Sequence, residues 1–179
     1  MKAFLFTAIM CTAVVQLSAQ ENIIWAEGQP LRWYDFAGPV KDTSRFDAES
    51  FAEVRYNYRF NSATDFYFEV YAKFDKSVSW CKKEYQSEAL LKHEQLHFDI
   101  AALYAQKLKA AFENFQYSED FKNEIFQIFN QKKTEYHLVQ QLYDDETNHS
   151  LNVNNQKDWE KAIAEQLNKK KYQLNLAKK

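Results

Sequence analysis

The residues that make tight turns are scarce in this sequence. Two glycines and two prolines occur among 179 residues, and no glycine-rich loop that could hold a phosphate group is present. Nucleotide-binding folds built on such loops are therefore unsupported. An excess of positive charge is also lacking. The sequence contains 23 lysines and arginines and 25 aspartates and glutamates, which gives a formal net charge of −2. The chain thus has no electrostatic reason to bind nucleic acid.

Cysteine occurs only twice, and the first copy, Cys11, lies in an apolar run near the start of the sequence. This run, from Ala3 to Val15, follows one lysine and precedes small and polar residues, which is the layout of a secretory signal peptide. Its length of about 13 residues falls short of the roughly 20 that a membrane-spanning helix needs. We therefore expect residues 1–19 to be a signal peptide, cleaved near Ala19, and the protein to be exported to the periplasm or secreted, with no stable membrane span. Lipid attachment at Cys11 is the weaker alternative.

Removal of the signal peptide would leave Cys81 as the sole cysteine. An intramolecular disulfide and a zinc site built on cysteine are then both excluded. The remaining residues, 20–179, are enough to bury one sizeable core, and the aromatic content of 17 % favours one. We predict a single domain over residues 20–179.

Two runs of alternating apolar and polar residues predict an antiparallel hairpin. The first covers residues 52–60 and the second residues 66–74, with a short polar stretch between them. A shorter strand is predicted over residues 31–36, where it could pair with the hairpin before Gly38 and Pro39 end it.

The apolar period changes to three or four residues from about Ser87, which predicts one long helix over residues 87–115. A second helix is expected to follow Ser118, its predicted N-cap, with an apolar stripe from Phe121 to Tyr143. Residues 144–156 are polar and are expected to be irregular, before a last helix that carries Trp159. Strands followed by helices indicate an α+β fold in which an antiparallel sheet packs on long helices.

Residues 93–97 read HEQLH, the motif that carries the chemistry of this sequence. On a helix, His93 and His97 lie one turn apart on one face and can share a zinc ion. Glu94 is rotated by about 100° from His93, so it lies beside the metal, where a carboxylate can take the proton of an attacking water. A surface helix with two solvated histidines is the alternative, but the leucines and isoleucine around the motif predict a buried helix.

A zinc site needs a third protein ligand, and the metzincin extension is absent because Ile100 and Leu103 stand where its glycine and histidine would be. If the two long helices are antiparallel, the segment that follows Tyr143 returns to the level of the HEQLH turn. This segment offers His149, our first choice as third ligand, and Asp144, our second.

His137 lies near the same level of the second helix but falls off its apolar stripe. We therefore expect His137 to be exposed rather than to bind the metal.

The sequence resembles a bacterial family of uncharacterised proteins that are named as zinc-dependent proteases of the zincin class. The resemblance rests on LRWYDFAG at 31–38, SW at 79–80, LLKHEQLHFDIA at 90–101, YDDETNH at 143–149 and QKDW at 156–159. It implies a zincin-like fold and a zinc site of His93, His97 and His149, with Glu94 catalytic. Ser150 departs from the pattern, since glycine is expected there, so the resemblance does not extend to the backbone turn after His149.

These observations favour an exported zinc metallopeptidase that acts on a peptide or protein substrate, with Glu94 as its general base. Tyr143 is a candidate to stabilise the oxyanion or to position Asp144, or is simply an aromatic residue that closes the apolar stripe. Asp144 is also a candidate partner that orients a ligating imidazole. Two alternatives stay open: a non-catalytic, zinc-stabilised binding module of the cell envelope, and a zinc amidase acting on cell-wall peptides.

Overall fold

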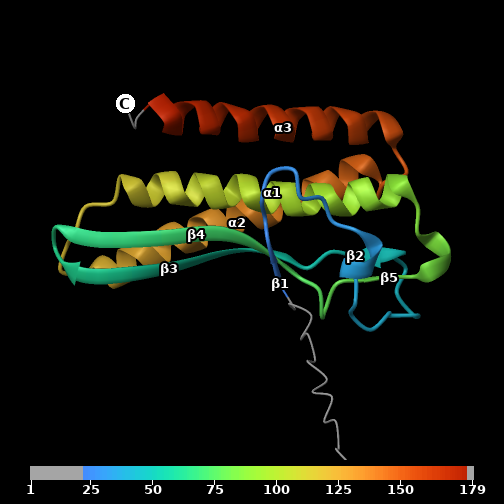
Figure 1. Ribbon diagram of the computed structural model, residues 1–179, viewed down its shortest axis with the longest axis horizontal. Helices are drawn as coiled ribbons and strands as arrows, with labels where there is room; N and C mark the ends of the chain where they lie inside the picture. Colours follow the sequence, from blue (N-terminus) through green and yellow to red (C-terminus); the bar gives the residue numbers. More distant parts are fainter. Residues whose placement is uncertain (1–21, 177–179) are drawn as a thin grey trace, which may run out of the picture.

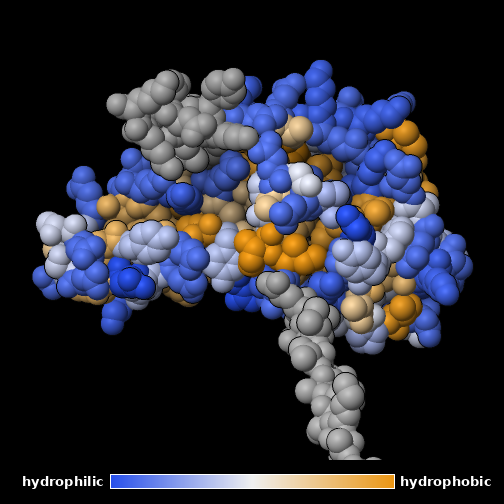
Figure 2. Space-filling model, viewed as in Figure 1, coloured by the Kyte–Doolittle hydropathy of each residue, from blue (hydrophilic) through white to orange (hydrophobic). Residues whose placement is uncertain are grey.

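The computed structural model describes residues 22–176 (Figure 1). The predicted signal peptide, residues 1–19, lies outside this part. None of the described helices combines the length and apolar character needed to cross a membrane. The face shown in Figure 2 is mostly hydrophilic, and apolar side chains gather on it near the place where the described chain begins.

The fold is α+β, as predicted, with a three-stranded antiparallel sheet packed against long helices. The strands are β1 (Asn22–Ile24), β3 (Ala52–Ser62) and β4 (Asp65–Asp75), in the order β1-β4-β3. A separate pair consists of β2 (Ala48–Glu49) and β5 (Trp80–Cys81). The helices are α1 (Glu88–Glu113), α2 (Phe121–Thr147) and α3 (Val153–Leu176), with short 3₁₀ turns at Trp33–Asp35 and Lys83–Tyr85.

The predicted hairpin is confirmed as β3 and β4, which pair along nearly their whole length. The register sets apolar residues of the two strands opposite one another, for example Val54 with Ala72 and Tyr56 with Val70. This apolar face packs on α1 and α2: the Tyr56 ring lies 5.2 Å from Phe112 and 4.8 Å from Phe129. Alternation with a period of two residues therefore buries one face and leaves the other to solvent.

The prediction of a strand over residues 31–36 is wrong. This segment contains a 3₁₀ turn at Trp33–Asp35, and the third strand of the sheet is instead β1, where Ile23 pairs with Phe74. The cause of the turn is the buried carboxylate of Asp35, which accepts a hydrogen bond from the Arg32 N–H at 2.9 Å and pairs with Lys76 at 2.9 Å. Such local hydrogen bonds compete with an extended conformation.

Helix α1 is the centre of the molecule, between the hairpin and α3 in Figure 1, and it also packs against α2. It begins after Ser87, whose hydroxyl accepts the Leu90 N–H at 3.2 Å. The prediction of a helix over residues 87–115 is therefore confirmed to within two residues at each end. Phe98 and Leu108 are fully buried in the core.

Helix α2 differs from the prediction at both ends. Its N-cap is Asp120 and not Ser118; the Ser118 hydroxyl accepts the Asp120 N–H at 3.1 Å and so stabilises the preceding turn. At its other end the helix continues to Thr147, where we expected irregular chain from residue 144 onwards. The link to α3 is accordingly short, and the Thr147 hydroxyl donates to the Tyr143 carbonyl at 2.7 Å within the last turn.

Gly38 allows the chain before β2 to pass directly against the segment that leads into β5. Its N–H donates to the Ser79 carbonyl at 2.8 Å, and a Cβ atom here would lie 2.7 Å from the carbonyl carbon of Val78. Real Cβ atoms do not approach backbone atoms so closely, so a side chain at this position would displace one of the two segments.

We predict that Gly38→Ala lowers the free energy of unfolding by about 3 kcal/mol, because rigid backbone has to move. The control is Gly28→Ala, where no atom lies within 4 Å and only the left-handed conformation, with φ of +76°, opposes a side chain, at a cost of about 1 kcal/mol. Urea unfolding of both variants gives the comparison. Equal losses would show that the close contact at Gly38 relaxes freely.

Candidate metal centre

The i, i+4 spacing on α1 brings the two motif histidines together, as predicted. The Nε2 atoms of His93 and His97 lie 3.3 Å apart, and His93 is 2 % exposed. Two ring nitrogens that face each other at this distance inside a protein need a shared proton or a shared cation. The arrangement therefore indicates that both Nε2 atoms are directed at one common partner.

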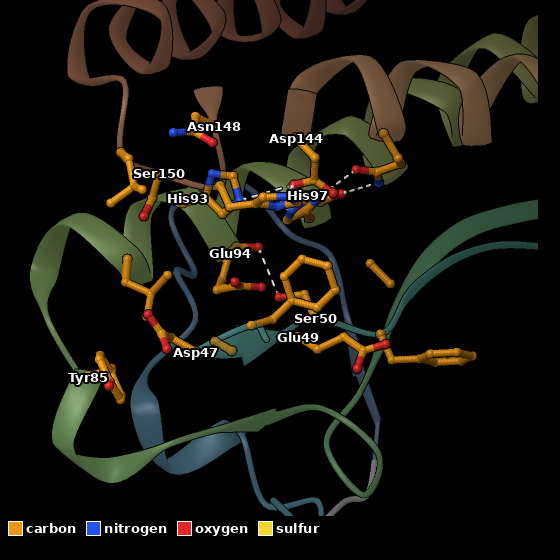
Figure 3. A pocket seen from close by; sticks show the side chains of 18 of the residues that line it. Asp47, Glu49, Ser50, Tyr85, His93, Glu94, His97, Asp144, Asn148 and Ser150 are labelled. Carbon is orange, nitrogen blue, oxygen red and sulfur yellow. Dashed lines mark hydrogen bonds and ion pairs between the residues drawn. The ribbon is translucent and has the colours of Figure 1, made fainter. Parts of the chain in front are cut away.

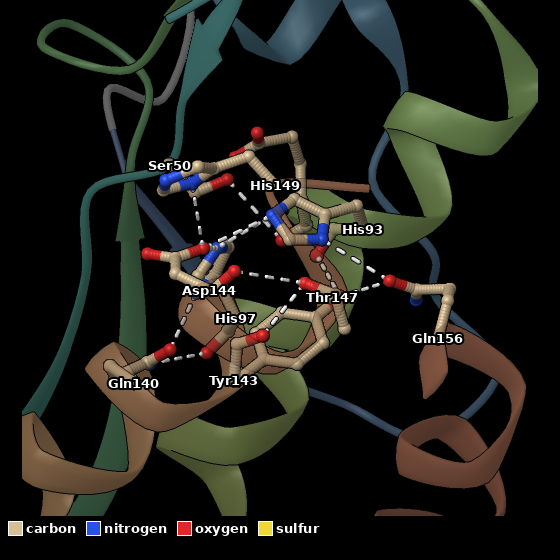
Figure 4. Close-up of polar contacts among 10 residues, drawn as sticks. Ser50, His93, His97, Gln140, Tyr143, Asp144, Thr147, His149 and Gln156 are labelled. Atoms are coloured by element: carbon tan, nitrogen blue, oxygen red, sulfur yellow. Dashed lines mark hydrogen bonds and ion pairs between the residues drawn. The ribbon is translucent and has the colours of Figure 1, made fainter. Parts of the chain in front are cut away.

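A third group, Asp144 from the last turns of α2, faces the same point. Its Oδ1 atom lies 3.2 Å from Nε2 of His93 and 3.0 Å from Nε2 of His97 (Figure 4). Asp144 reaches the histidines because α2 runs antiparallel to α1 and stays helical past Tyr143. His93, His97 and Asp144 form a group that could hold a metal ion, and within residues 22–176 it is the group of this kind that the structure reveals.

The spacing of the three ligand atoms fits a small cation. Two ligands of a tetrahedral zinc ion, each about 2.0–2.1 Å from it, lie about 3.3 Å from each other. The three distances observed here are 3.3, 3.2 and 3.0 Å. Two imidazole nitrogens and a carboxylate oxygen are also donors of the type found in catalytic zinc sites.

Two glutamines that the sequence analysis did not identify hold the imidazoles in place. Nδ1 of His97 faces Oε1 of Gln140 at 2.5 Å, and Nδ1 of His93 faces Oε1 of Gln156 at 3.2 Å. An amide oxygen only accepts, so each contact requires a proton on Nδ1 and leaves Nε2 available as a ligand. One signal was in the sequence, since Gln140 precedes Asp144 by four residues and so shares its helix face; Gln156 lies 63 residues from His93 and gave none.

Tyr143 lies beneath the histidines and is fully buried. Its hydroxyl is 2.7 Å from Oε1 of Gln156 and 3.1 Å from the carbonyl oxygen of His93, and its ring stacks on the His93 ring at 4.7 Å. Burial raises the pKa of Tyr143 well above its usual value, so the hydroxyl stays protonated. Tyr143 does not line the groove described below, so its position favours a role in holding His93 and Gln156 over direct contact with a substrate.

Glu94 is buried beside the histidines, and one of its carboxylate oxygens lacks a hydrogen-bond partner within the described chain. Its side chain is 3 % exposed overall, and its Oε2 atom has no hydrogen-bond partner among the residues that the structure describes. Figure 3 shows the carboxylate between the histidines and the segment just after β2 that contains Ser50, whose hydroxyl donates to the Glu94 backbone carbonyl at 3.2 Å. A buried carboxylate oxygen without a partner is costly, which indicates a function that uses it.

His149 lies on the loop between α2 and α3, close to the group but outside it. Its Nδ1 atom is 3.5 Å from Oδ1 of Asp144, its side chain is 41 % exposed, and its ring packs 4.8 Å from Phe46. The loop has positive φ angles at three successive residues, Asn148, His149 and Ser150. His137 is exposed and lines the groove one turn before Gln140.

The close contacts shift the pKa values of the group in opposite directions. Burial lowers the pKa of His97, but the hydrogen bond to Asp144 and the nearby charge of Glu94 outweigh it and raise the pKa to about 9. For Asp144, burial raises the pKa, and the hydrogen bonds to His93 and His97 more than compensate, so the pKa falls well below its usual range.

The group opens into a groove of about 920 Å³ (Figure 3). One wall is a continuous run of chain, residues 45–52, which includes β2; the opposite wall comes from α1, α2 and residues 148–151. Strand β2 is paired on one side only within the described chain, with β5.

Residues 72–150 of the chain match the model of a family described as a bacterial protein of unknown function (DUF922). The match includes the end of β4, all of α1 and α2 and hence His93, His97 and Asp144, and it covers just under half of the chain. Neither the curated proteins nor the solved structures gave a match to this sequence.

We predict that Gln140→Leu lowers the affinity for zinc about 10–100-fold, because the His97 imidazole loses the acceptor that fixes its Nδ1 proton. Gln141→Leu is the matched control, since Gln141 is the neighbouring exposed residue. Competition with a chromophoric chelator measures both affinities. Equal affinities in the two variants would show that Gln140 does not orient the ligand.

Proposed function

We propose that this chain is an exported zinc-dependent hydrolase that cleaves peptide bonds, with the zinc held by His93, His97 and Asp144. The observation that carries the proposal is the buried, unpartnered carboxylate oxygen of Glu94 beside this group. A site that only stabilises the fold has no need for an unpaired carboxylate at that place. Zinc is favoured over harder cations because two of the three donors are imidazoles.

A zinc ion bound there supplies a Lewis acid, which makes water acidic and polarises a carbonyl group. The chain supplies the remaining chemistry. Glu94 accepts the proton of the attacking water at Oε2 and returns it to the nitrogen of the leaving amine, so that no net proton is consumed by the enzyme. The low-dielectric surroundings of Glu94 strengthen its interaction with the proton that it transfers.

The shape of the groove favours a peptide as the substrate. Residues 45–52 run along one wall, and an extended peptide can add to the unpaired edge of β2 by backbone hydrogen bonds. The carboxylate of Glu94 lies between this wall and the histidines, where a peptide bond held against β2 would pass (Figure 3). A cell-wall peptide would satisfy the same geometry, so the proposal covers amide bonds in both proteins and cell-wall peptides.

His149 is the alternative third ligand in this proposal. It lies within 3.5 Å of the Asp144 oxygen, and a change of its side-chain rotamer would alter its distance from the two Nε2 atoms. Asp144 is placed first because its oxygen is already in contact with both imidazoles, and a carboxylate also compensates the charge of the cation.

We also propose that residues 20–179 act as one domain and that residues 1–19 direct export. The single-domain proposal is supported by α1, which packs against the sheet, α2 and α3 and thus joins all parts of the described chain. The export proposal is supported by the apolar run that begins the sequence.

Purified protein is expected to contain about one zinc ion per chain and to hydrolyse members of a peptide library, and Glu94→Gln is expected to keep the zinc and lose activity by 10²–10⁴-fold. The amide has nearly the same size as the carboxylate but does not accept the proton. Elemental analysis and mass spectrometry of the cleaved peptides measure the two properties.

Glu88→Gln is the matched control, because Glu88 is an exposed residue of the same helix that pairs with Lys92 at 2.8 Å. It should retain both zinc and activity. If the parent binds zinc but cleaves nothing in the library, the proposal gives way to a zinc-stabilised binding module. If Glu94→Gln cleaves as fast as the parent, Glu94 is not the base.

The third ligand is tested by two substitutions. We predict that Asp144→Asn lowers zinc affinity at least 100-fold, because an anionic ligand in contact with both imidazoles is lost, and that His149→Ala lowers it less than 10-fold. Isothermal titration with zinc measures both, and circular dichroism checks the fold. The reverse order of the two effects would assign the third position to His149.

A further inference from the structure

The metal centre continues into α3 through a chain of hydrogen bonds that ends at Glu160. Oε1 of Gln156 faces Nδ1 of His93 at 3.2 Å and accepts from the Tyr143 hydroxyl at 2.7 Å (Figure 4). At its other end, Nε2 of Gln156 donates to Oε1 of Glu160 at 2.9 Å. Gln156 is 7 % exposed, so its amide has no water to satisfy it and depends on these three partners.

The amide of Gln156 could occupy this space in two orientations. Rotation by 180° exchanges its oxygen and its NH₂ group with almost no change of shape. In the rotated form the NH₂ group faces His93, whose Nδ1 must then be the acceptor, and the imidazole proton moves to Nε2. Asp144 would accept that proton, since its oxygen lies 3.2 Å from Nε2. The rotated network is thus complete on the side of the histidine, but it blocks Nε2 as a ligand.

The hydroxyl of Tyr143 is compatible with both orientations of the Gln156 amide. Its hydroxyl can donate to the oxygen of Gln156, as observed, or accept from the NH₂ group while it donates to the backbone carbonyl of His93, 3.1 Å away. The choice therefore depends on the partner at the far end. A carboxylate only accepts, so Glu160 attracts the NH₂ group and repels the oxygen of the amide.

We infer that Glu160 is a positioning residue of the metal centre, which holds the Gln156 amide with its oxygen toward His93 and so keeps Nε2 of His93 free to bind a metal. Glu160 is half-buried on α3, one turn after Gln156, and it lines a hollow on the other side of α1 rather than the substrate groove. It acts on the ligand through Gln156, whose amide donates to it at 2.9 Å. The importance of the ligand rests on the proposed function; the orientation of the amide does not.

The experiment varies the hydrogen-bonding character of residue 160. One substitution keeps an acceptor for the Gln156 amide, one leaves only a donor, and one removes both. In Glu160→Gln the new side chain can still offer an oxygen to Gln156, and zinc affinity should stay within about 3-fold of the parent. In Glu160→Lys only a donor is present, so the amide should rotate and zinc affinity should fall about 10–100-fold. Glu160→Met, with no polar atom to choose an orientation, should give an intermediate loss and serves if the lysine variant folds poorly.

Two further measurements separate this role from a general loss of stability or of negative charge. Nuclear Overhauser effects from the Gln156 NH₂ protons should connect to residue 160 in the parent and to the Tyr143 ring in Glu160→Lys, with or without zinc. Glu165→Lys makes the same charge change at an exposed position of the same helix and should leave zinc affinity unchanged. The double variant Gln156→Glu with Glu160→Lys should recover affinity, because a carboxylate at position 156 presents an oxygen to His93 in either orientation.

The inference is overturned if the amide keeps its orientation in Glu160→Lys, or if the double variant fails to recover zinc affinity while remaining folded. Failure of the proposed function has a different signature. A parent protein that binds no zinc would refute the metal centre, whereas the orientation of the Gln156 amide would still respond to residue 160.

Discussion

His93, His97 and Asp144 converge on one another inside the protein, and the surrounding structure has to support that convergence. Polar groups removed from water destabilise a fold unless each one finds a partner. Here both Nε2 atoms face one carboxylate oxygen, and each Nδ1 atom faces the amide oxygen of a glutamine. These partners come from α2 and α3, so the histidines of α1 are fixed only when all three helices are packed together.

Long elements whose apolar residues repeat regularly along the whole element could be predicted from the sequence. The β3–β4 hairpin has an alternating pattern over its whole length, and α1 has a helical pattern over its 26 residues, so in both cases local preference and burial agree. The prediction was wrong for short segments, in which a few residues determine the local structure. Strand β1 has three residues, and the turn at Trp33–Asp35 depends on the contact of Asp35 with Lys76, far along the chain. The last turn of α2 appeared irregular because its polar residues include Asp144, which faces the site rather than solvent.

The candidate site was predictable to the extent that its chemistry is local in sequence. His93, Glu94 and His97 follow from spacing on one helix, and Asp144 from the antiparallel return of α2. The choice between Asp144 and His149 depends on where the helix ends, which polar composition alone did not reveal. Gln156 and Glu160 could not have been found, because a glutamine gains a specific role only when tertiary packing places both of its ends. The unpaired oxygen of Glu94 likewise becomes visible only in three dimensions.

The loop between α2 and α3 bears on how this protein can evolve. Asn148, His149 and Ser150 have φ angles of 47°, 50° and 76°, a region that asparagine and glycine adopt readily but that costs most other side chains, here those of His149 and Ser150, about 1 kcal/mol. A single glycine in this loop, for instance in place of Ser150, is therefore an accessible stabilising substitution that the chain does not carry. Proteins commonly keep such strain beside functional groups, where selection acts on performance rather than on stability. The loop is thus a place where descendants of this sequence could gain tolerance to destabilising mutations elsewhere without any change to the buried histidines.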